Sequence, residues 1–372
     1  MNIILFFTYG ISLNDWKNSG ILNKELTIYK KLYKNKDVNF TFITYGDKSD
    51  LSILDVKEKI QVLPVYQSRK FIKNKYLRFL DSLLIPFRLK NQIKQADIYK
   101  TNQLLGAWVP IIAKLLYKKP LIVRTGYDLL TFSILNKKKK IKVLFYKLLT
   151  RYSLSKCDLY IVSSKVDRDF LANKFAKFKY KIKVRPNWIL NNVQKGFSNR
   201  YDKKIISVGR LEEQKNFHEL IESISGSDYE VVVYGAGSQK NMLENFAKEI
   251  GVSLEIKNPI DNDSLLKELN KYRAYITTSN FEGNPKAVLE AMSCGCVVIA
   301  KNNKNILEII ENNYNGFIFK NKNEVVSILN DIISDKNKWD SYSNRSLGSV
   351  LKNNEINKIL DDEWTDYLQL TR

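Results

Sequence analysis

Strand-like apolar runs alternate with segments of helical period along the whole chain, and the pattern starts afresh near its middle. In the first half, helical-period segments at 20–33, 79–95, 107–117 and 141–153 separate the apolar runs 3–8, 40–44, 98–100, 121–124 and 159–163. In the second half, the apolar runs are 204–208, 230–234, 254–257, 274–277 and 297–300. Strands separated by helices predict parallel sheets, so we expect an α/β protein with two doubly wound, Rossmann-like domains.

The break between the two halves falls in a polar stretch without periodicity. We therefore expect an N-terminal domain over residues 1–186, a linker over 187–202 and a C-terminal domain over 203–354. Residues 355–372 have helical period and are expected to form a last helix. Two such domains are expected to face a ligand cleft between them.

Charge is distributed unevenly along the 372 residues, whose net charge is +22. Residues 1–190 contain 38 Lys and Arg against 13 Asp and Glu, a net of +25, whereas the remainder has a net of −3. The basic half suits an anionic partner such as lipid headgroups, an anionic glycan or nucleic acid. A general lysine bias is the alternative, but the nearly neutral second half argues against it as the full explanation.

Two segments of the basic half are candidates for membrane contact. Residues 77–94 mix apolar and basic side chains, and residues 141–156 place five apolar side chains on one helical face: Ile141, Leu144, Phe145, Leu148 and Tyr152. A core helix with a solvated basic face is the commoner structure for such a pattern. Charge thus favours peripheral contact with an anionic membrane, and neither helix establishes it.

The compartment is predicted from what is missing. No apolar run reaches the ~18–20 residues of a membrane-spanning helix, and the first residues lack the flanks of a signal peptide. The three cysteines, Cys157, Cys294 and Cys296, have neither disulfide nor metal-ligand spacing. These features favour a protein of the reducing cytoplasm.

The most informative segment for function is residues 279–300, SNFEGNPKAVLEAMSCGCVVIA. Asn284 is a favourable helix cap, and Pro285 suits the first helical position. The backbone N–H groups of Lys286, Ala287 and Val288 then have no acceptor within the helix. Together with the positive end of the helix dipole, they predict a phosphate site.

Two glutamates flank this predicted helix start. Glu282 lies in the loop ahead of it, and Glu290 lies on the first turns behind it. Carboxylates are unsuited to phosphate but suit hydroxyl groups, which a nucleotide sugar carries on both sides of its diphosphate. Two glutamates eight positions apart are common by chance. The prediction therefore depends on the whole segment, in which loop, helix, turn and strand follow in order.

A second segment, residues 207–217 (SVGRLEEQKNF), follows an apolar run. Gly209 turns the chain, and Arg210 and Lys215 come before the next helix. Strand ends in such sheets face the ligand crevice, so both cations are expected to stabilise a leaving diphosphate. The alternative is a solvated cation pair with Glu212 and Glu213 as partners.

Other motifs are weaker. Gly235 lies in YGAGS, which lacks the third glycine of a dinucleotide fingerprint and predicts a tight turn near the nucleotide rather than a cofactor site. Asp167–Asp169 and Asp261–Asp263 have D-x-D spacing but fall near helix starts, where aspartate caps. We expect no metal and no cofactor.

The two motifs together resemble the E-x7-E signature and the GRL…K-N segment of retaining glycosyltransferases of the GT-B fold, family 4. The resemblance implies that Glu290 binds the ribose of the donor and Glu282 the transferred sugar. It also implies that the diphosphate oxygen accepts the proton of the acceptor, and that the last helix crosses back onto the N-terminal domain.

In the N-terminal domain the resemblance is weaker. It implies acceptor-side residues after the first strand and after the strand at 121–124, and the candidates are Gly10, Trp16, Gly20, Arg124, Tyr127 and Asp128. The family's paired glycines are absent from the first loop. The single histidine, His218, lies in the other domain, so the sequence assigns no general base.

The expected function is transfer of a sugar from a nucleotide-diphosphate donor to a lipid-linked or cell-surface glycan, such as lipopolysaccharide or capsule, at the inner face of the cell membrane. A nucleotide-sugar epimerase of the same fold is the first alternative. A basic nucleic-acid-binding protein without enzymatic activity is the second, and it gives no role to residues 279–300.

Overall fold

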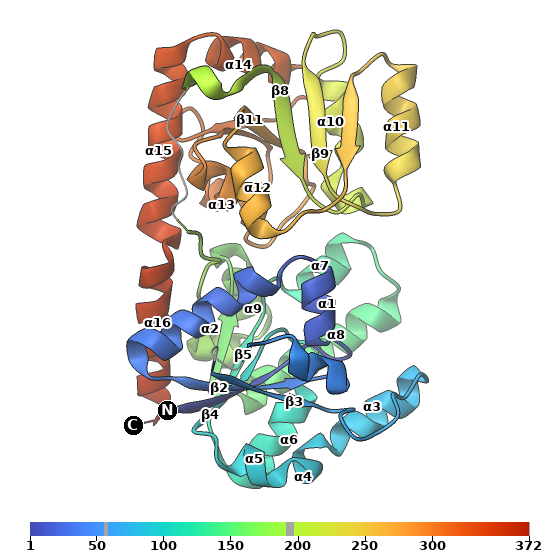
Figure 1. Ribbon diagram of the computed structural model, residues 1–372, viewed down its shortest axis with the longest axis vertical. Helices are drawn as coiled ribbons and strands as arrows, with labels where there is room; N and C mark the ends of the chain where they lie inside the picture. Colours follow the sequence, from blue (N-terminus) through green and yellow to red (C-terminus); the bar gives the residue numbers. More distant parts are fainter. Residues whose placement is uncertain (56–58, 191–196, 372) are drawn as a thin grey trace. The chain divides into compact units, whose positions relative to one another are not determined.

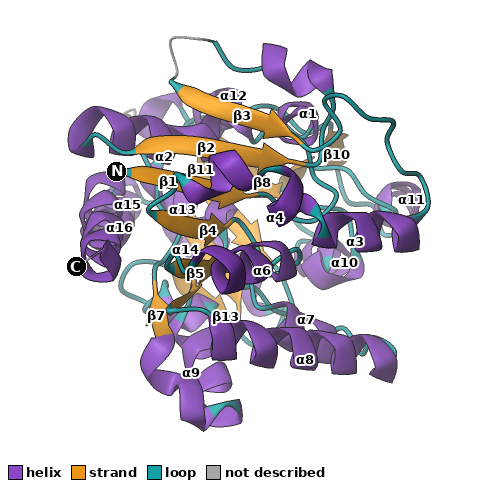
Figure 2. Ribbon diagram, turned by 90° about the horizontal axis from the view of Figure 1, so that it is seen from below, coloured by secondary structure: helices purple, strands orange, loops and turns teal. Residues whose placement is uncertain are grey.

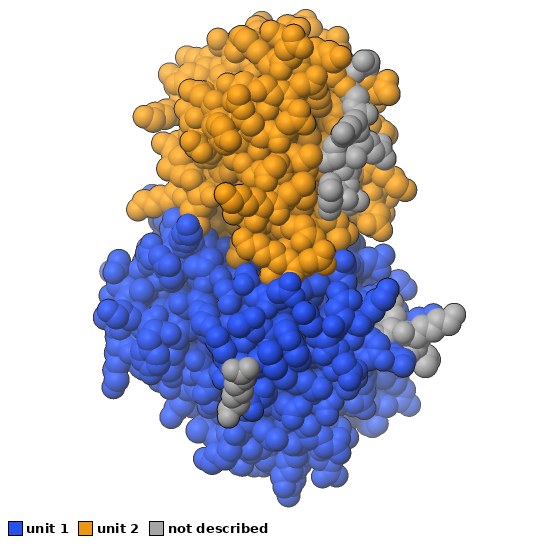
Figure 3. All heavy atoms as spheres, turned by 90° about the vertical axis from the view of Figure 1, so that its left-hand side faces the viewer, with its two compact units in different colours: residues 1–185, 359–372 blue, residues 186–358 orange. Residues whose placement is uncertain are grey.

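Contacts divide the chain into two compact units. The computed structural model describes residues 1–55, 59–190 and 197–371. Unit 1 comprises residues 1–185 together with 359–372, and unit 2 comprises residues 186–358 (Figure 3). The segment expected as a linker, 187–202, falls within unit 2, and its residues 191–196 lie outside the described part.

Unit 1 is built on a parallel sheet of seven strands in the order β3-β2-β1-β4-β5-β6-β7 (Figure 2). The strands are β1 (Asn2–Phe6), β2 (Asn39–Thr44), β3 (Ile60–Pro64), β4 (Ile98–Thr101), β5 (Leu121–Arg124), β6 (Leu159–Val162) and β7 (Ile182–Val184). In register, Ile3 of β1 lies between Phe40 of β2 and Ile98 of β4. The order reverses between β1 and β4, as in doubly wound folds.

The helices of unit 1 cover both faces of this sheet. They are α1 (Leu13–Asn18), α2 (Leu22–Lys36), α3 (Lys75–Leu83), α4 (Ile85–Arg88), α5 (Lys90–Lys94), α6 (Trp108–Tyr117), α7 (Leu129–Leu135), α8 (Lys140–Lys156), α9 (Lys165–Lys174) and the greater part of α16 (Ile356–Thr371). The prediction of a single helix at 79–95 is wrong, because three short helices, α3, α4 and α5, cover this segment. Pro86, which has no N–H to continue a helix, lies at the start of α4.

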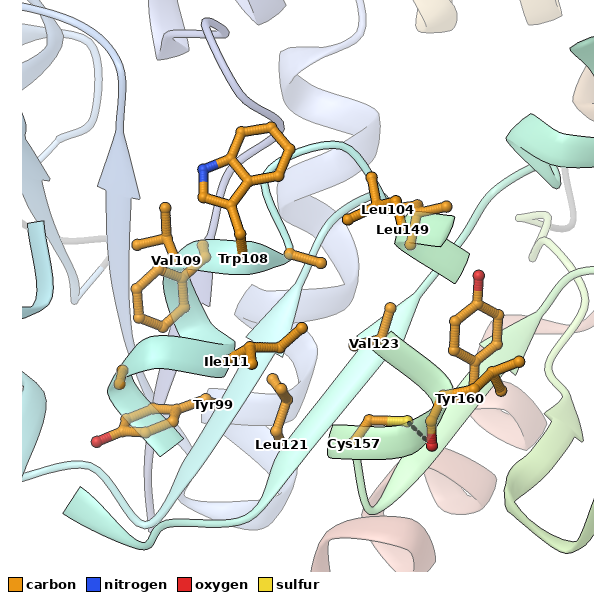
Figure 4. Packing of buried hydrophobic residues seen from close by; sticks show 14 of the residues in the cluster. Tyr99, Leu104, Trp108, Val109, Ile111, Leu121, Val123, Leu149, Cys157 and Tyr160 are labelled. Atoms are coloured by element: carbon orange, nitrogen blue, oxygen red, sulfur yellow. Dashed lines mark hydrogen bonds between the residues drawn. The ribbon is translucent and has the colours of Figure 1, made fainter. Parts of the chain in front are cut away.

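One hydrophobic core of unit 1 lies between the sheet and the helices α6 and α8. Ile111 of α6, Val123 of β5 and Leu149 of α8 belong to it, and Figure 4 shows them around Leu121 and Tyr160. The final helix, α16, returns to unit 1 after the chain has completed unit 2. The predicted crossing-back of the last helix is thus confirmed.

Unit 2 repeats the design with six parallel strands in the order β10-β9-β8-β11-β12-β13 (Figure 1). Its strands are β8 (Tyr201–Val208), β9 (Glu230–Tyr234), β10 (Leu254–Lys257), β11 (Tyr272–Thr277), β12 (Val297–Lys301) and β13 (Phe317–Phe319). Its helices are α10 (Phe217–Ser223), α11 (Lys240–Glu249), α12 (Asn262–Leu269), α13 (Lys286–Ser293), α14 (Glu324–Ile333) and α15 (Lys336–Asn354). The predicted architecture, two Rossmann-like units with parallel sheets, is confirmed.

Candidate functional site

The order of the unit 2 sheet reverses between β8 and β11, and the sequence motifs cluster at this point. Gly209 and Arg210 follow the carboxyl end of β8, Gly235 follows that of β9, and Glu282 lies in the loop that follows β11. In open α/β sheets, ligands bind outside the carboxyl ends of the strands where the order reverses. The topology therefore brings the predicted donor residues to the position where such a fold binds ligands.

Two glycines allow the loops after β8 and β9 to touch. A Cβ atom on Gly235 would lie 1.9 Å from the carbonyl oxygen of Gly209, a distance no side chain tolerates. A Cβ atom on Gly209 would lie 3.1 Å from Cε of Lys215. The glycines of YGAGS thus serve close backbone packing, since Gly237 likewise approaches the carbonyl of Leu211.

Lys215 and Glu282 join the loops after β8 and β11. Nζ of Lys215 lies 2.6 Å from Oε1 of Glu282, and the two side chains are only 18% and 8% exposed. Hydrogen bonds hold the same loops together, because Thr278 donates to the carbonyl of Asn216 at 2.8 Å and Gln214 donates to the carbonyl of Phe281 at 3.0 Å.

The partners expected for the cation pair are different in the structure. The Glu212 carboxylate accepts hydrogen bonds from the backbone N–H and the hydroxyl of Ser238, at 3.1 and 3.0 Å. Lys215 pairs with Glu282 instead, and Arg210 extends into solvent from the end of β8. One cation is therefore held at the loop junction, and the other is exposed.

The start of α13 differs from the expectation by one residue. Pro285 occupies the cap position, and the helix begins at Lys286. The side-chain oxygen of Asn284 accepts from the backbone N–H of Asn187 at 2.8 Å, so this side chain is not the helix cap. The prediction of Asn284 as a cap was wrong because a partner about a hundred positions away in sequence takes its side-chain oxygen.

The N-terminus of α13 nevertheless keeps its predicted donors. The first hydrogen bond of the helix runs from the N–H of Leu289 to the carbonyl of Pro285. The helix itself thus supplies no acceptor to the N–H groups of Ala287 and Val288. These donors lie at the positive end of the helix dipole.

Glu290 lies on the second turn of α13 and is buried. Its Oε1 accepts a hydrogen bond of 2.7 Å from Nδ2 of Asn262, at the start of α12. Burial raises the pKa of the Tyr275 hydroxyl, and the nearby negative charges of Glu282 and Glu290 raise it further. Both glutamates therefore lie near one buried tyrosine of β11.

The D-x-D motifs lie at helix starts. The carboxylate of Asp261 caps α12 by accepting from the N–H of Ser264 at 3.0 Å, and Asp167 lies in the first turn of α9. His218 is half-buried and stacks on the ring of Phe246. Among the described residues, no three His, Cys, Asp or Glu side chains come together as a metal site.

The acceptor-side candidates of unit 1 divide into loop and core residues. Gly10 and Gly20 have positive φ angles on either side of α1. Trp16 is buried and stacks on Phe7 with 4.3 Å between the ring centroids. Its side chain packs in the core of unit 1, and its acceptor-side role stays a prediction.

The candidates after β5 also have structural partners. Arg124 points towards Glu363 of α16, with 4.0 Å between their charged atoms. Asp128 caps α7 by accepting from the N–H and the hydroxyl of Thr131, both at 2.6 Å, and burial raises the pKa of its carboxyl. Of this group only Tyr127 is exposed.

An aromatic group at the same end of the unit 1 sheet was missed by sequence reasoning. Tyr9, Tyr45 and Tyr66 follow the carboxyl ends of β1, β2 and β3, and the rings of Tyr9 and Tyr45 lie 5.3 Å apart. The guanidinium of Arg78, on α3, lies 5.7 Å from the centre of the Tyr9 ring. The sequence pattern that could have revealed this group is a tyrosine one to three residues after each of these three strands.

Known proteins resemble this chain in sequence and in fold. Residues 190–346 match the family model described as glycosyl transferases group 1. A Campylobacter jejuni relative, N-acetylgalactosamine-N,N'-diacetylbacillosaminyl-diphospho-undecaprenol 4-alpha-N-acetylgalactosaminyltransferase, is 24% identical over 285 residues, which are 74% of this chain and 78% of that protein. An uncharacterized glycosyltransferase of Haemophilus influenzae is 24% identical over 58% of this chain and 62% of its own length.

Solved structures share the whole fold. HepE of Anabaena, in complex with UDP and glucose, superposes with a TM-score of 0.76 at 15% identity and 99% coverage of both chains. Sucrose-phosphate synthase of Thermosynechococcus elongatus superposes with a TM-score of 0.79 at 13% identity, over 100% of this chain and 99% of its own. The chain is therefore a glycosyltransferase of the GT-B fold, and its resemblance to the glycosyl transferases of group 1 spans the strand-end site of unit 2.

Proposed function

We propose that the protein transfers a sugar, with retention of configuration, from a nucleoside-diphosphate sugar to a lipid-linked or cell-surface glycan, as a member of family 4. The name of the Campylobacter relative describes transfer onto a diphospho-undecaprenol-linked sugar, and the Anabaena structure contains UDP and glucose. These two proteins support the acceptor class and the donor class, respectively.

One observation carries the donor half of the proposal: Lys215, Glu282 and the start of α13 converge at the carboxyl ends of β8 and β11. In the proposed complex, the N–H groups of Ala287 and Val288 bind a phosphate oxygen. Glu290 binds the ribose, and Glu282 binds the transferred sugar.

The proposed reaction needs positive charge where the diphosphate leaves. The bond between the anomeric carbon and the phosphate oxygen breaks, and a bond to the acceptor oxygen forms on the same face. The acceptor proton passes to the leaving diphosphate, whose charge Lys215 and Arg210 stabilise. This chemistry assigns no role to a metal, so we expect transfer to persist in EDTA.

The acceptor half of the proposal belongs to unit 1. Gly10, Gly20 and Tyr127 lie in loops at the carboxyl ends of its strands, as does Tyr9, whose ring lies 5.7 Å from the guanidinium of Arg78 on α3. Aromatic rings and a guanidinium suit a sugar and an anionic group. The basic charge of this unit supports a peripheral location at the inner face of the cell membrane.

A thermal-shift panel of nucleoside diphosphates and their sugars tests the donor half, because a ligand that binds only the folded protein raises its melting temperature. One selectively stabilising donor is then incubated with a lipid-linked acceptor, and the product linkage is assigned by NMR. An inverted linkage would overturn retention. Conversion of the donor without any acceptor would identify an epimerase, and salt-sensitive binding of DNA without donor stabilisation would favour the nucleic-acid-binding protein.

A further inference from the structure

The apolar stripe of α8 faces solvent. Its five members are between 43% and 77% exposed: Ile141, Leu144, Phe145, Leu148 and Tyr152. The opposite face of the same helix packs against unit 1 through Leu149, Thr150, Ser153 and Leu154 (Figure 4 shows Leu149). The structure thereby decides the alternative that the sequence left open, because the apolar stripe does not form the core.

A second apolar surface covers α3 and α4. Tyr76, Leu77, Leu80, Leu84 and Phe87 are each between 50% and 69% exposed. Single exposed apolar side chains are ordinary on a folded protein, but rows of them mark an interaction surface. These five residues and the five exposed apolar residues of α8 together form a surface that we call the apolar face.

Both parts of the apolar face lie beside α6. Helix α6 contacts α3 and α4 on one side and α8 on the other, and Figure 2 shows α6 between α4 and α8. The intervening α6 exposes Leu115 and Leu116 near its end. The two stripes therefore flank one helix on the same side of the unit 1 sheet.

The apolar face is surrounded by positive charge. Residues 129–157 contain eight Lys and Arg and no Asp or Glu. Residues 59–96 contain nine Lys and Arg and one acid, Asp81, which is buried and paired with Arg69 and Arg88. No exposed carboxylate of these two segments therefore opposes an anionic partner.

We propose that the apolar face inserts into the headgroup region of an anionic lipid bilayer, with Lys142, Lys147 and Arg151 of α8 contacting the headgroups. Helices that lie in a membrane interface combine an apolar stripe with flanking cations in this way. Among the described residues, no helix is long and apolar enough to cross a bilayer. The contact is therefore one of surface insertion.

Charge argues against a second copy of this chain as the occupant. Unit 1 contains 39 Lys and Arg against 17 Asp and Glu, a net of +22, whereas unit 2 contains 22 of each. Two copies of unit 1 would repel each other at the apolar face. The inference rests on the proposed function only in that a lipid-linked acceptor is held at a membrane surface.

Flotation of the full chain with vesicles tests the proposal, without donor or acceptor. The apolar variant carries Ile141→Ser, Leu144→Ser and Leu148→Ser, and the charge variant carries Lys142→Gln, Lys147→Gln and Arg151→Gln. The matched control replaces three exposed apolar residues of unit 2, Met242→Ser, Leu307→Ser and Tyr314→Ser. Circular dichroism and melting temperature establish that each variant is folded.

We expect the wild type and the control to bind vesicles containing about 30% phosphatidylglycerol about tenfold more than pure phosphatidylcholine vesicles, and the apolar and charge variants each to lose most of that binding. A Leu148→Trp variant is expected to shift its fluorescence to the blue with these vesicles. Undiminished binding of the apolar variant would overturn insertion. Failure of the wild type to float would overturn the proposal as a whole.

Two further readouts separate the alternatives. The first is light scattering. If the wild type is a dimer that does not bind vesicles, and the apolar variant is a monomer, the face binds a second copy and the proposal is overturned. Stabilisation by nucleoside diphosphates is measured on the same variants. Stabilisation by a nucleoside diphosphate without flotation would leave the proposed function intact and overturn the membrane contact. Flotation without such stabilisation would leave the membrane contact intact and count against the proposed function.

Discussion

At the scale of the residue, the ion pair between Lys215 and Glu282 has two roles in the proposed site. It joins two loops across the reversal of strand order, and it holds an ammonium group where the diphosphate leaves. The two roles predict different losses. Removing the lysine takes away charge at the reacting centre and leaves a carboxylate that is only 8% exposed without its partner.

Lys215→Ala is expected to lower the rate of sugar transfer by about 10²–10³, the usual effect of removing one preorganised charge from a transition state. The unfolding free energy should fall by about 1–3 kcal/mol, because Glu282 loses its buried partner. Transfer assays and urea unfolding measure the two quantities. Lys203→Ala, which removes a lysine paired with exposed Asp228, is the control and should change neither.

A second residue-scale prediction concerns Gly235. Gly235→Ala forces a Cβ atom onto the carbonyl oxygen of Gly209, so the loops after β8 and β9 must separate. We expect a loss of at least about 1–3 kcal/mol in unfolding free energy, as for overpacked interiors. Nothing lies within 4 Å of the corresponding atom on Gly348, in α15, where Gly348→Ala should stabilise by about 0.5–1 kcal/mol. Equal stability of the two variants would contradict this account.

At the scale of the element, apolar runs identified the central strands because both faces of a parallel sheet are buried. Three short strands were missed: β3 and β7, which form the edges of the unit 1 sheet, and β13, at one edge of the unit 2 sheet. β7 and β13 are only three residues long, too short to show a period. The remaining edge strand, β10, was identified from its apolar run, so edge position alone does not hide a strand.

Helix patterns showed the same limit. The period of α8 identified its apolar stripe, but period alone does not say whether a stripe faces the core or the solvent. The cap of α13 could not be read from Asn284, whose side chain binds the backbone of Asn187. Arg210 and Glu282 could be placed near the reversal of strand order because they lie in loops that follow apolar runs. The burial of Trp16 and Asp128 depends on tertiary packing, which the sequence pattern does not show.

Helix α16 offers an element-scale prediction. Its Glu363 forms a buried ion pair with Lys100 of β4, Nζ of Lys100 also donates to the Tyr367 hydroxyl at 2.9 Å, and burial lowers the pKa of Lys100. Glu363→Ala leaves a buried cation without its carboxylate and should cost about 3–5 kcal/mol. Asp361→Ala, which breaks an exposed pair on the same helix, should cost about 0–1 kcal/mol.

The second arm of this test removes both charges. The double variant Lys100→Met with Glu363→Leu should regain most of the lost stability, because neither partner then remains buried and charged. Urea unfolding of the three variants measures these differences. If the double variant were as unstable as Glu363→Ala, packing of α16 and not charge would explain the loss.

At the scale of the whole molecule, the two units have separate hydrophobic cores. We expect calorimetry to resolve two unfolding transitions, because units with separate cores unfold with limited cooperativity. A nucleoside diphosphate that binds the folded protein should raise the temperature of the unit 2 transition. At 100 times its Kd, it should add about 2.7 kcal/mol to the unfolding free energy of that unit. Hydrogen exchange assigns each transition to residues, and protection centred in unit 1 would contradict the placement of the donor site.

The return of α16 to unit 1 also sets an order of events during synthesis on the ribosome. Residues 359–371 are made after all of unit 2, so the strand that carries Lys100 waits for its carboxylate until the rest of the chain has emerged. Unit 1 is therefore the first unit to be started on the ribosome and the last to be completed. In a nascent chain stalled before residue 359, Lys100 still lacks the carboxylate of Glu363 even when unit 2 has already folded.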